Sequence, residues 1–195
     1  MTNPRNPVLL VHGFLDKKSK FRTMEKYLTK RGWQTHSFDL LPNYGRKSLV
    51  ELAAQVKDYA EQNFASDQTF DLVGFSMGGL VTRYYLQRLG GDERVERYVS
   101  ISAPNHGTIA AVLPLPGIRE MARQSEFVAD LNRDVATCLT NIKVTWMWTP
   151  YDLMILPANS SELPVGREVK LSVPLHPWMV SDLRALEAVA IALSE

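Results

Sequence analysis

Residues 74–78, Gly-Phe-Ser-Met-Gly, constrain this chain more than any other segment because of what lies on each side of them. A short apolar run, residues 70–75, leads into them and is rich in strand-forming side chains. Helix-like sequence follows directly. A Gly-x-Ser-x-Gly pattern between a strand and a helix predicts a tight turn that presents the serine hydroxyl above the end of the strand.

The chemistry of this turn depends on small neighbours. A serine in strained backbone crowds the positions two residues away on each side, and Gly74 and Gly78 fill these positions without a Cβ atom. Gly79 allows the following helix to pass close to the adjoining strand. The N-terminus of that helix favours negative charge developing near Ser76. An ordinary glycine turn is the alternative, and we favour a nucleophilic serine because a strand and a helix flank it.

Strand-like and helix-like segments alternate along the whole chain. This alternation predicts an α/β fold, in which about six mostly parallel strands form a sheet with helices on both faces. Because the 195 residues contain no linker or internal repeat, we expect a single domain over residues 1–195. The predicted strands are residues 7–11, 33–38, 70–75, 95–102, 143–148 and 168–173. The predicted helices are residues 19–31, 49–64 behind a capping box of Ser48 and Glu51, 77–89 and 181–193.

The charge balance argues against a nucleic-acid partner. Lys and Arg together number 22, and Asp and Glu number 21, so no overall field attracts a polyanion. Basic residues gather between positions 17 and 31. We favour a solvated helix face for this cluster, with transient contact to an anionic membrane surface as the alternative. The sequence leaves the oligomeric state open.

Cysteine content and hydropathy predict a cytoplasmic protein. The single cysteine, Cys138, excludes an internal disulfide. Residues 1–7 contain no long apolar stretch of the kind found in a signal peptide. No apolar run approaches the ~18 residues that indicate a transmembrane helix.

A nucleophilic serine needs a base, and only four histidines are available. His176 lies after the last predicted strand and before the last helix, where the chain order serine, acid, histidine assigns the base. His106 lies after the fourth predicted strand and is the alternative. For the acid we favour Asp152, because it directly follows the strand at residues 143–148. It would orient the imidazole of His176 and stabilise its charged form.

Two backbone amides are expected to form an oxyanion hole, which binds negative charge on the reacting carbonyl oxygen. One belongs to Met77, the residue after the nucleophile. The other belongs to Phe14, because Gly13 allows the chain to turn after the first strand. In this interpretation the backbone near His12 matters and its imidazole does not.

Three motifs together resemble the α/β-hydrolase lipases and esterases, above all the small bacterial lipases without a large cap domain. They are residues 8–14, Val-Leu-Leu-Val-His-Gly-Phe; residues 74–79, Gly-Phe-Ser-Met-Gly-Gly; and residues 102–108, Ser-Ala-Pro-Asn-His-Gly-Thr. The resemblance implies a compact α/β-hydrolase fold with Ser76, Asp152 and His176 as a catalytic triad. The sequence starts at what would be the third strand of larger hydrolases. It shows no carboxylate cluster typical of a calcium site, and we expect neither a structural metal nor a cofactor.

Apolar residues near the predicted site suit an acyl chain. The expected substrate-binding residues are Leu15, Leu113, Leu115, Met154, Ile155, Leu175 and Trp178. Burial in the core is an equally good interpretation for many of them. We expect a serine hydrolase that cleaves carboxylic esters with apolar acyl groups. A thioesterase or amidase with the same triad is the alternative, as is a binding protein whose catalysis has lapsed.

Overall fold

Six parallel strands form the centre of the protein, in a computed structural model that describes residues 5–195. Their order across the sheet is β2-β1-β3-β4-β5-β6. Residues 1–4, part of the segment in which we expect no signal peptide, lie outside the described residues. The strands are β1 (Val8–Val11), β2 (Thr35–Ser37), β3 (Phe70–Phe75), β4 (Val95–Ile101), β5 (Lys143–Trp148) and β6 (Arg167–Lys170).

The central strands are buried on both faces, as their continuous apolar sequences predict. In β1, Leu9 and Val11 pack into one hydrophobic cluster, while Val8 and Leu10 pack into a second cluster on the other face. This division follows from the two-residue repeat of a strand, which points successive side chains to opposite faces. The sheet therefore needs a layer of helices on each side.

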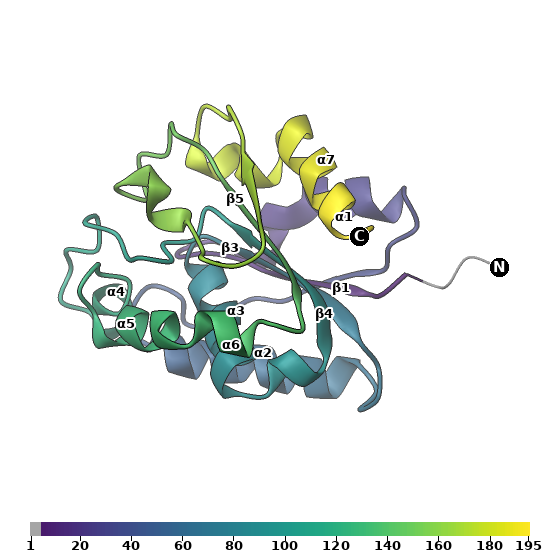
Figure 1. Ribbon diagram of the computed structural model, residues 1–195, viewed down its shortest axis with the longest axis horizontal. Helices are drawn as coiled ribbons and strands as arrows, with labels where there is room; N and C mark the ends of the chain where they lie inside the picture. Colours follow the sequence, from purple (N-terminus) through teal and green to yellow (C-terminus); the bar gives the residue numbers. More distant parts are fainter. Residues whose placement is uncertain (1–4) are drawn as a thin grey trace.

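The α-helices form two layers, one on each face of the sheet (Figure 1). The first layer consists of α1 (Arg22–Thr29) and α7 (Leu183–Ala192). The second consists of α2 (Leu49–Asn63), α3 (Met77–Arg88), α4 (Pro116–Arg119), α5 (Glu126–Arg133) and α6 (Val135–Cys138). Short 3-10 helices are η1 (Lys18–Phe21), η2 (Gly91–Glu93), η3 (Ala158–Ser161) and η4 (His176–Val180). The loops after the strands gather at the left of Figure 1.

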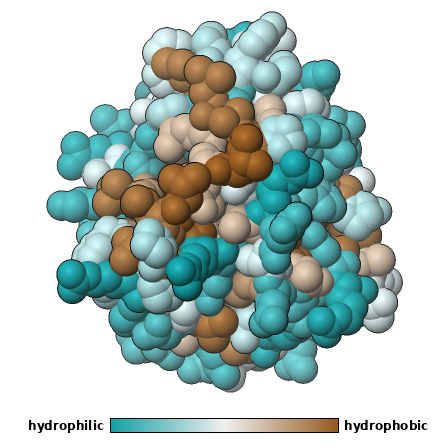
Figure 2. Space-filling view, turned by 90° about the vertical axis from the view of Figure 1, so that its left-hand side faces the viewer, coloured by the Kyte–Doolittle hydropathy of each residue, from teal (hydrophilic) through white to brown (hydrophobic). Residues whose placement is uncertain are grey.

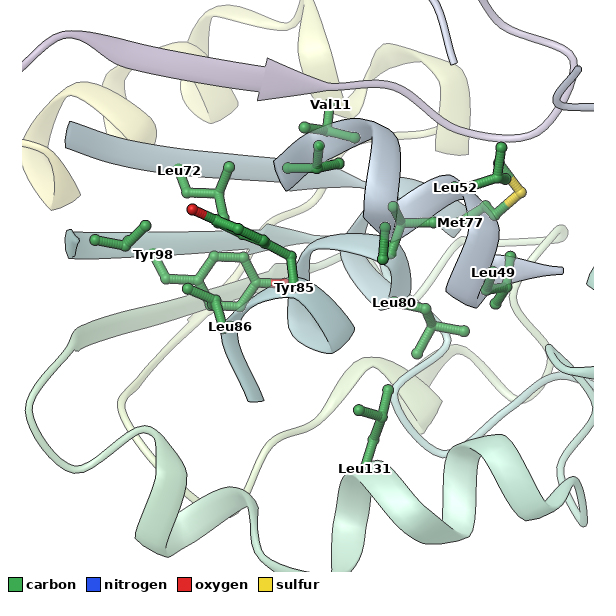
Figure 3. Packing of buried hydrophobic residues seen from close by; sticks show 14 of the residues in the cluster. Val11, Leu49, Leu52, Leu72, Met77, Leu80, Tyr85, Leu86, Tyr98 and Leu131 are labelled. Atoms are coloured by element: carbon green, nitrogen blue, oxygen red, sulfur yellow. The ribbon is translucent and has the colours of Figure 1, made fainter. Parts of the chain in front are cut away.

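Helix α3 is buried between its neighbours, which fixes the segment that follows Ser76. Met77 and Leu80 lie between Leu49 and Leu52 of α2 and Leu131 of α5 (Figure 3). Helix α2 begins at the predicted capping box, in which the Ser48 hydroxyl accepts the Glu51 N–H. The first residues of α3 are thus held from both sides.

The prediction of an α/β fold with helices on both faces is confirmed, and the strands are all parallel rather than mostly parallel. Predicted ends of several elements were wrong. Strand β2 covers residues 35–37 rather than 33–38, and β6 covers 167–170 rather than 168–173. Both are edge strands, with one partner each to maintain regular pairing. The sequence reading also missed α4, α5 and α6, which connect β4 to β5.

Within residues 5–195, no helix combines the length and the apolar character needed to span a bilayer.

Candidate active site

The backbone at Ser76 has the geometry of a sharp strand-to-helix turn. Its φ of 56° and ψ of −127° lie in a region of backbone angles that residues other than glycine rarely adopt. A Cβ atom at Gly74 would come within 2.8 Å of the Gly78 carbonyl oxygen, and one at Gly78 would collide with the carbonyl oxygens of Val11 and His12. The glycine pattern is therefore a steric requirement of this turn.

Asp152 and His176 form a buried pair beside this turn. The Nδ1 atom of His176 and the Oδ2 atom of Asp152 are 2.6 Å apart. The other carboxylate oxygen of Asp152 accepts the backbone N–H groups of Met154 and Ile155, each at 2.9 Å. The imidazole packs against the ring of Phe75, the residue before Ser76, at a centroid distance of 4.9 Å. Asp152 is therefore held rigidly and orients the imidazole.

The loops that carry these two residues are tied together. The hydroxyl of Thr149, which follows β5, donates to the carbonyl oxygen of Val173 at 2.6 Å. Asp152 lies three residues after Thr149, and His176 lies three residues after Val173. This bond joins the two segments near their strand ends, so the acid and the histidine keep their relative positions.

The segment after β1 packs directly against Ser76. A Cβ atom at Gly13 would come within 2.9 Å of the Cβ atom of Ser76, so only a glycine permits this approach. Phe14 lines the same cleft as Ser76. On the other side, Met77 begins α3, and a first-turn N–H has no carbonyl partner within its own helix. The two amides proposed from the sequence thus belong to segments that adjoin the serine.

The imidazole of His12 has a structural role that the sequence reading missed. Its Nε2 atom accepts the Leu40 N–H at 3.0 Å, which leaves Nδ1–H to donate to the Gly13 carbonyl oxygen at 3.0 Å. Burial lowers the pKa of His12 and favours the neutral ring that these two bonds require. The side chain therefore fixes the bend at Gly13 that carries Phe14.

An apolar cleft of about 320 Å³ opens at Ser76. Three of the predicted substrate-binding residues line it: Leu113, Met154 and Ile155. The other four, Leu15, Leu115, Leu175 and Trp178, are not among the residues that line it. The apolar segment 109–118, which the sequence places above the site, contributes Ala110, Ala111 and Ile118 to its wall as well. The residues of the wall that were not predicted are Pro104, Thr108, Met121 and Leu153.

Leu115 packs against the hydrophobic core, whereas Leu15, Leu175 and Trp178 face solvent outside the cleft. Trp178 lies in η4, two residues beyond His176. Burial in the core, the alternative interpretation for this set, therefore applies to Leu115. The three exposed residues form part of the molecular surface around the site.

His106, the alternative base, lies apart from Asp152. It lines a separate hollow of about 190 Å³ with Arg123 and Glu162, and its Nδ1 atom is 3.4 Å from the side-chain nitrogen of Asn132. Burial, with a smaller effect of Arg83, lowers the pKa of His106. The geometry favours His176 over His106 as the partner of the acid.

Arg83 of α3 is a buried residue near the site that the sequence reading also missed. Its guanidinium donates to the side chain of Gln87, to the main-chain and side-chain oxygens of Asn105, to the carbonyl of Leu131 and to the side chain of Asn132. No carboxylate lies among these acceptors, and burial lowers its pKa to about 10. Arg83 thus joins the helix after Ser76 to the loop after β4, which includes the cleft residues Pro104 and Thr108.

Two solved structures share the fold of this protein. Bacillus licheniformis lipase BlEst2 in mature form has a TM-score of 0.80 at 15% identity, over 97% of this chain and 92% of that chain. Aspergillus fumigatus lipase B has a TM-score of 0.81 at 17% identity, over 100% of this chain and 54% of that chain. The protein has the α/β-hydrolase fold, as its motifs predicted.

A sequence-family model places the chain more narrowly. The model described as palmitoyl protein thioesterase matches residues 7–151, and the chain belongs to that family. Human lysosomal thioesterase PPT2 is 34% identical over 107 residues, which cover 52% of this chain and 34% of the human protein. The bovine protein of the same name is 33% identical over the same shares. The chain therefore spans about a third of the length of the curated relatives that it matches.

The family match includes Ser76 but ends one residue before Asp152. The proposed roles of the acid and the histidine therefore rest on the geometry of this protein alone. The cellular compartment stays a prediction.

Proposed function

We propose that this protein is a serine hydrolase that cleaves thioesters or oxygen esters of apolar acyl groups through an acyl-enzyme on Ser76. The observation that carries the proposal is the buried pair of Asp152 and His176, 2.6 Å apart, beside a serine at the mouth of an apolar cleft. Family membership favours a thioester over the oxygen ester that the motifs alone suggest.

The proposed reaction begins when the Nε2 atom of His176 removes the hydroxyl proton of Ser76. The serine oxygen attacks the carbonyl carbon, and the amides of Phe14 and Met77 stabilise the oxyanion that forms. The imidazolium, held by Asp152, then returns its proton to the leaving thiol or alcohol. Water attacks the acyl-enzyme by the same route and releases the acid, while the apolar cleft holds the acyl chain throughout.

The triad is tested by labelling the purified chain with a fluorophosphonate, which reacts with an activated serine. Wild type should label and hydrolyse a short p-nitrophenyl ester. Ser76→Ala should lose labelling and at least about a thousandfold in turnover, because no other group provides the attacking oxygen. His176→Ala should lose both activities because the serine then has no base. His106→Ala is the matched control and should label at close to the wild-type rate.

The opposite result for the two histidines would identify His106 as the base. If the wild-type protein is folded but does not label, the lapsed-catalysis alternative holds. Binding of a fluorescent fatty acid to the same protein would then show whether the cleft still accepts acyl chains.

The leaving group is tested with pairs of substrates that share one acyl chain and differ only in oxygen or sulfur. We expect kcat/KM to favour the thioester at every chain length, and to rise with chain length until the cleft is filled. Amides with the same acyl chains should react far more slowly, because an amine is a poor leaving group. A preference for the oxygen ester throughout the series would instead favour the carboxylic ester hydrolase that the motifs alone suggest.

A further inference from the structure

Exposed apolar side chains concentrate at one edge of this protein. Of the fourteen large hydrophobic residues exposed among residues 5–195, eleven lie in the segments that follow the strands, at the edge that contains Ser76. The most exposed of all, between 61% and 78%, are Leu15, Leu41, Ile109, Val112 and Leu153, which we call the apolar rim. Figure 2 shows hydrophobic residues in a band across the face that lies at the left of Figure 1.

Three residues of the apolar rim lie in the cleft lining or next to it in the chain. Leu153 lines the cleft itself, Leu15 follows the lining residue Phe14, and Val112 lies between the lining residues Ala111 and Leu113. The Ile109 N–H donates to the carbonyl oxygen of Leu156, which ties the loop after β4 to the loop after β5. A surface that covers the rim therefore faces the opening to Ser76.

Positive charge lies along one side of the rim. Four basic residues lie in the two segments that contain Leu15 and Leu41, and we call them the basic flank: Lys17, Lys18, Arg46 and Lys47. The two segments lie side by side because the Leu15 N–H donates to the Asn43 carbonyl and the Asn43 side chain donates to the Asp16 carbonyl. Within residues 5–195, no side chain of the basic flank is ion-paired with a carboxylate.

Few acidic residues lie near this charge, and one of them, Glu51 at the start of α2, interacts with Lys47. The segments after the strands, residues 12–20, 38–47, 102–118, 149–157 and 171–178, contain three acidic residues. Asp152 is hydrogen-bonded to the imidazole of His176. The Oδ1 atom of Asp16 lies 3.8 Å from the Nζ atom of Lys20, and the carboxylate of Asp39 accepts the Lys18 backbone N–H. The molecule as a whole has a net charge of only +1, so the positive side of the rim is a local feature.

We propose that the apolar rim and the basic flank dock on an anionic lipid bilayer and open the cleft toward its acyl chains. A bilayer combines an apolar interior with a negatively charged headgroup layer beside it, which matches leucines that project next to unpaired lysines. Interfaces between proteins are instead depleted in lysine. An acyl chain drawn from the bilayer would reach Ser76 without crossing water.

What the docked chain does to a substrate rests on the proposed function, but docking itself does not require catalysis. The experiment therefore uses the Ser76→Ala variant of residues 1–195 and measures its co-sedimentation with vesicles of phosphatidylcholine, with and without phosphatidylglycerol. We expect binding to the anionic vesicles, weakened by added salt, and little binding to the neutral ones. A failed labelling test with successful vesicle binding would overturn only the proposed function.

Two pairs of variants test the residues. Leu41→Glu with Val112→Glu should reduce vesicle binding at least about tenfold, whereas Leu183→Glu with Ile191→Glu, on exposed positions of α7, should not. Lys17→Gln with Lys18→Gln should reduce binding about fivefold for each charge removed, whereas Lys26→Gln on α1 with Lys30→Gln at its C-cap should change it little. Circular dichroism and thermal melts verify that each variant is folded.

Equal binding to neutral and anionic vesicles, no binding to either, or equal loss in the α7 control would overturn the proposal. A dimer in solution that the Leu41→Glu/Val112→Glu protein no longer forms would assign the rim to a second copy of this chain, and would also overturn it.

Discussion

Asp71 carries a buried carboxyl group at the end of the sheet opposite the proposed active site. Its Oδ1 atom accepts from the Asn6 side chain at 3.1 Å and from Arg97 at 3.3 Å, while Oδ2 has no hydrogen-bond partner among the described residues. Burial dominates over these contacts and raises the pKa of Asp71 to about 6. The folded protein therefore holds this proton more tightly than the unfolded chain does.

The pH dependence of stability should reveal this group. With a folded pKa near 6 and an unfolded pKa of 3.8, ionisation of Asp71 opposes folding. Its contribution to the free energy of unfolding is largest below pH 4 and is lost as the pH rises toward 6, by about 3 kcal/mol at most. Asp71→Asn should lack this loss, so its stability relative to wild type should increase between pH 4 and pH 6 in urea titrations. A constant difference across this range would mean that Asp71 ionises normally.

Single residues also mark the limit of prediction from the sequence. The position of Ser76, Asp152 and His176 at one edge of the sheet was predictable because parallel strands bring their following loops to that edge; their catalytic roles stay a prediction. Only part of the cleft wall was predictable, because irregular loops give no periodicity from which side-chain directions follow. Met121, for example, reaches the cleft because its carbonyl oxygen accepts the Thr108 N–H from a distant segment.

Among the elements, α3 contains a fully buried arginine whose hydrogen bonds reach two other segments. The buried guanidinium of Arg83 donates hydrogen bonds to neutral acceptors in the loop after β4 and at the end of α5. The carbonyl of Leu131 lies in the last turn of α5, where the helix dipole favours a positive charge. Arg83 thus holds three segments in place from one position in the helix that follows the nucleophile.

Removal of this side chain should damage both stability and catalysis. Arg83→Met leaves several buried acceptors without a donor and should lower the free energy of unfolding by about 3 kcal/mol or more. It should also lower kcat/KM, because the loop with Pro104 and Thr108 loses its anchor. Arg88→Met on the same helix is the control: it breaks part-exposed ion pairs with Asp130 and Asp134 and should cost about 1 kcal/mol or less. Thermal melts and ester kinetics compare them, and equal effects would contradict the role of Arg83.

Helices and strands were predicted correctly where their hydrophobic pattern was distinct, and were missed where the element was too short to show one. The buried runs of β1, β3 and β5 and the long pattern of α2 gave clear signals. Helices α4 and α6 have four residues each, about one turn, which is too short to show a helical period. Helix α5 has a local signal that was overlooked, since Ser125 caps it by accepting the Val128 N–H.

At the scale of the whole molecule, one sheet connects the two hydrophobic clusters. Leu52 of α2 belongs to one cluster and Leu28 of α1 to the other, and both are fully or almost fully buried. Because each central strand contributes side chains to both clusters, neither cluster can be lost while the other keeps its strands. The single domain over residues 1–195 stays a prediction, and the shared strands are consistent with it.

Unfolding should accordingly be a single transition. Leu52→Ala and Leu28→Ala should each lower the free energy of unfolding by about 2–5 kcal/mol and shift the entire curve. Far-UV circular dichroism and tryptophan fluorescence should give the same midpoint, because Trp33 packs in one cluster and Trp146 in the other. Separate midpoints in either variant would show that the two layers unfold independently.

The order of the strands also bears on how the protein is made. From β3 to β6, each new strand joins the side of the sheet that the previous strand left open, so a chain emerging from a ribosome can extend its sheet one strand at a time. Until the next strand is synthesised, the open edge of such a nascent chain can pair with a neighbouring chain on the same messenger. Strand β6 ends this exposure with the charged residues Arg167, Glu168 and Lys170. Only then does translation reach His176, so a nascent chain would gain its proposed base after its sheet is complete.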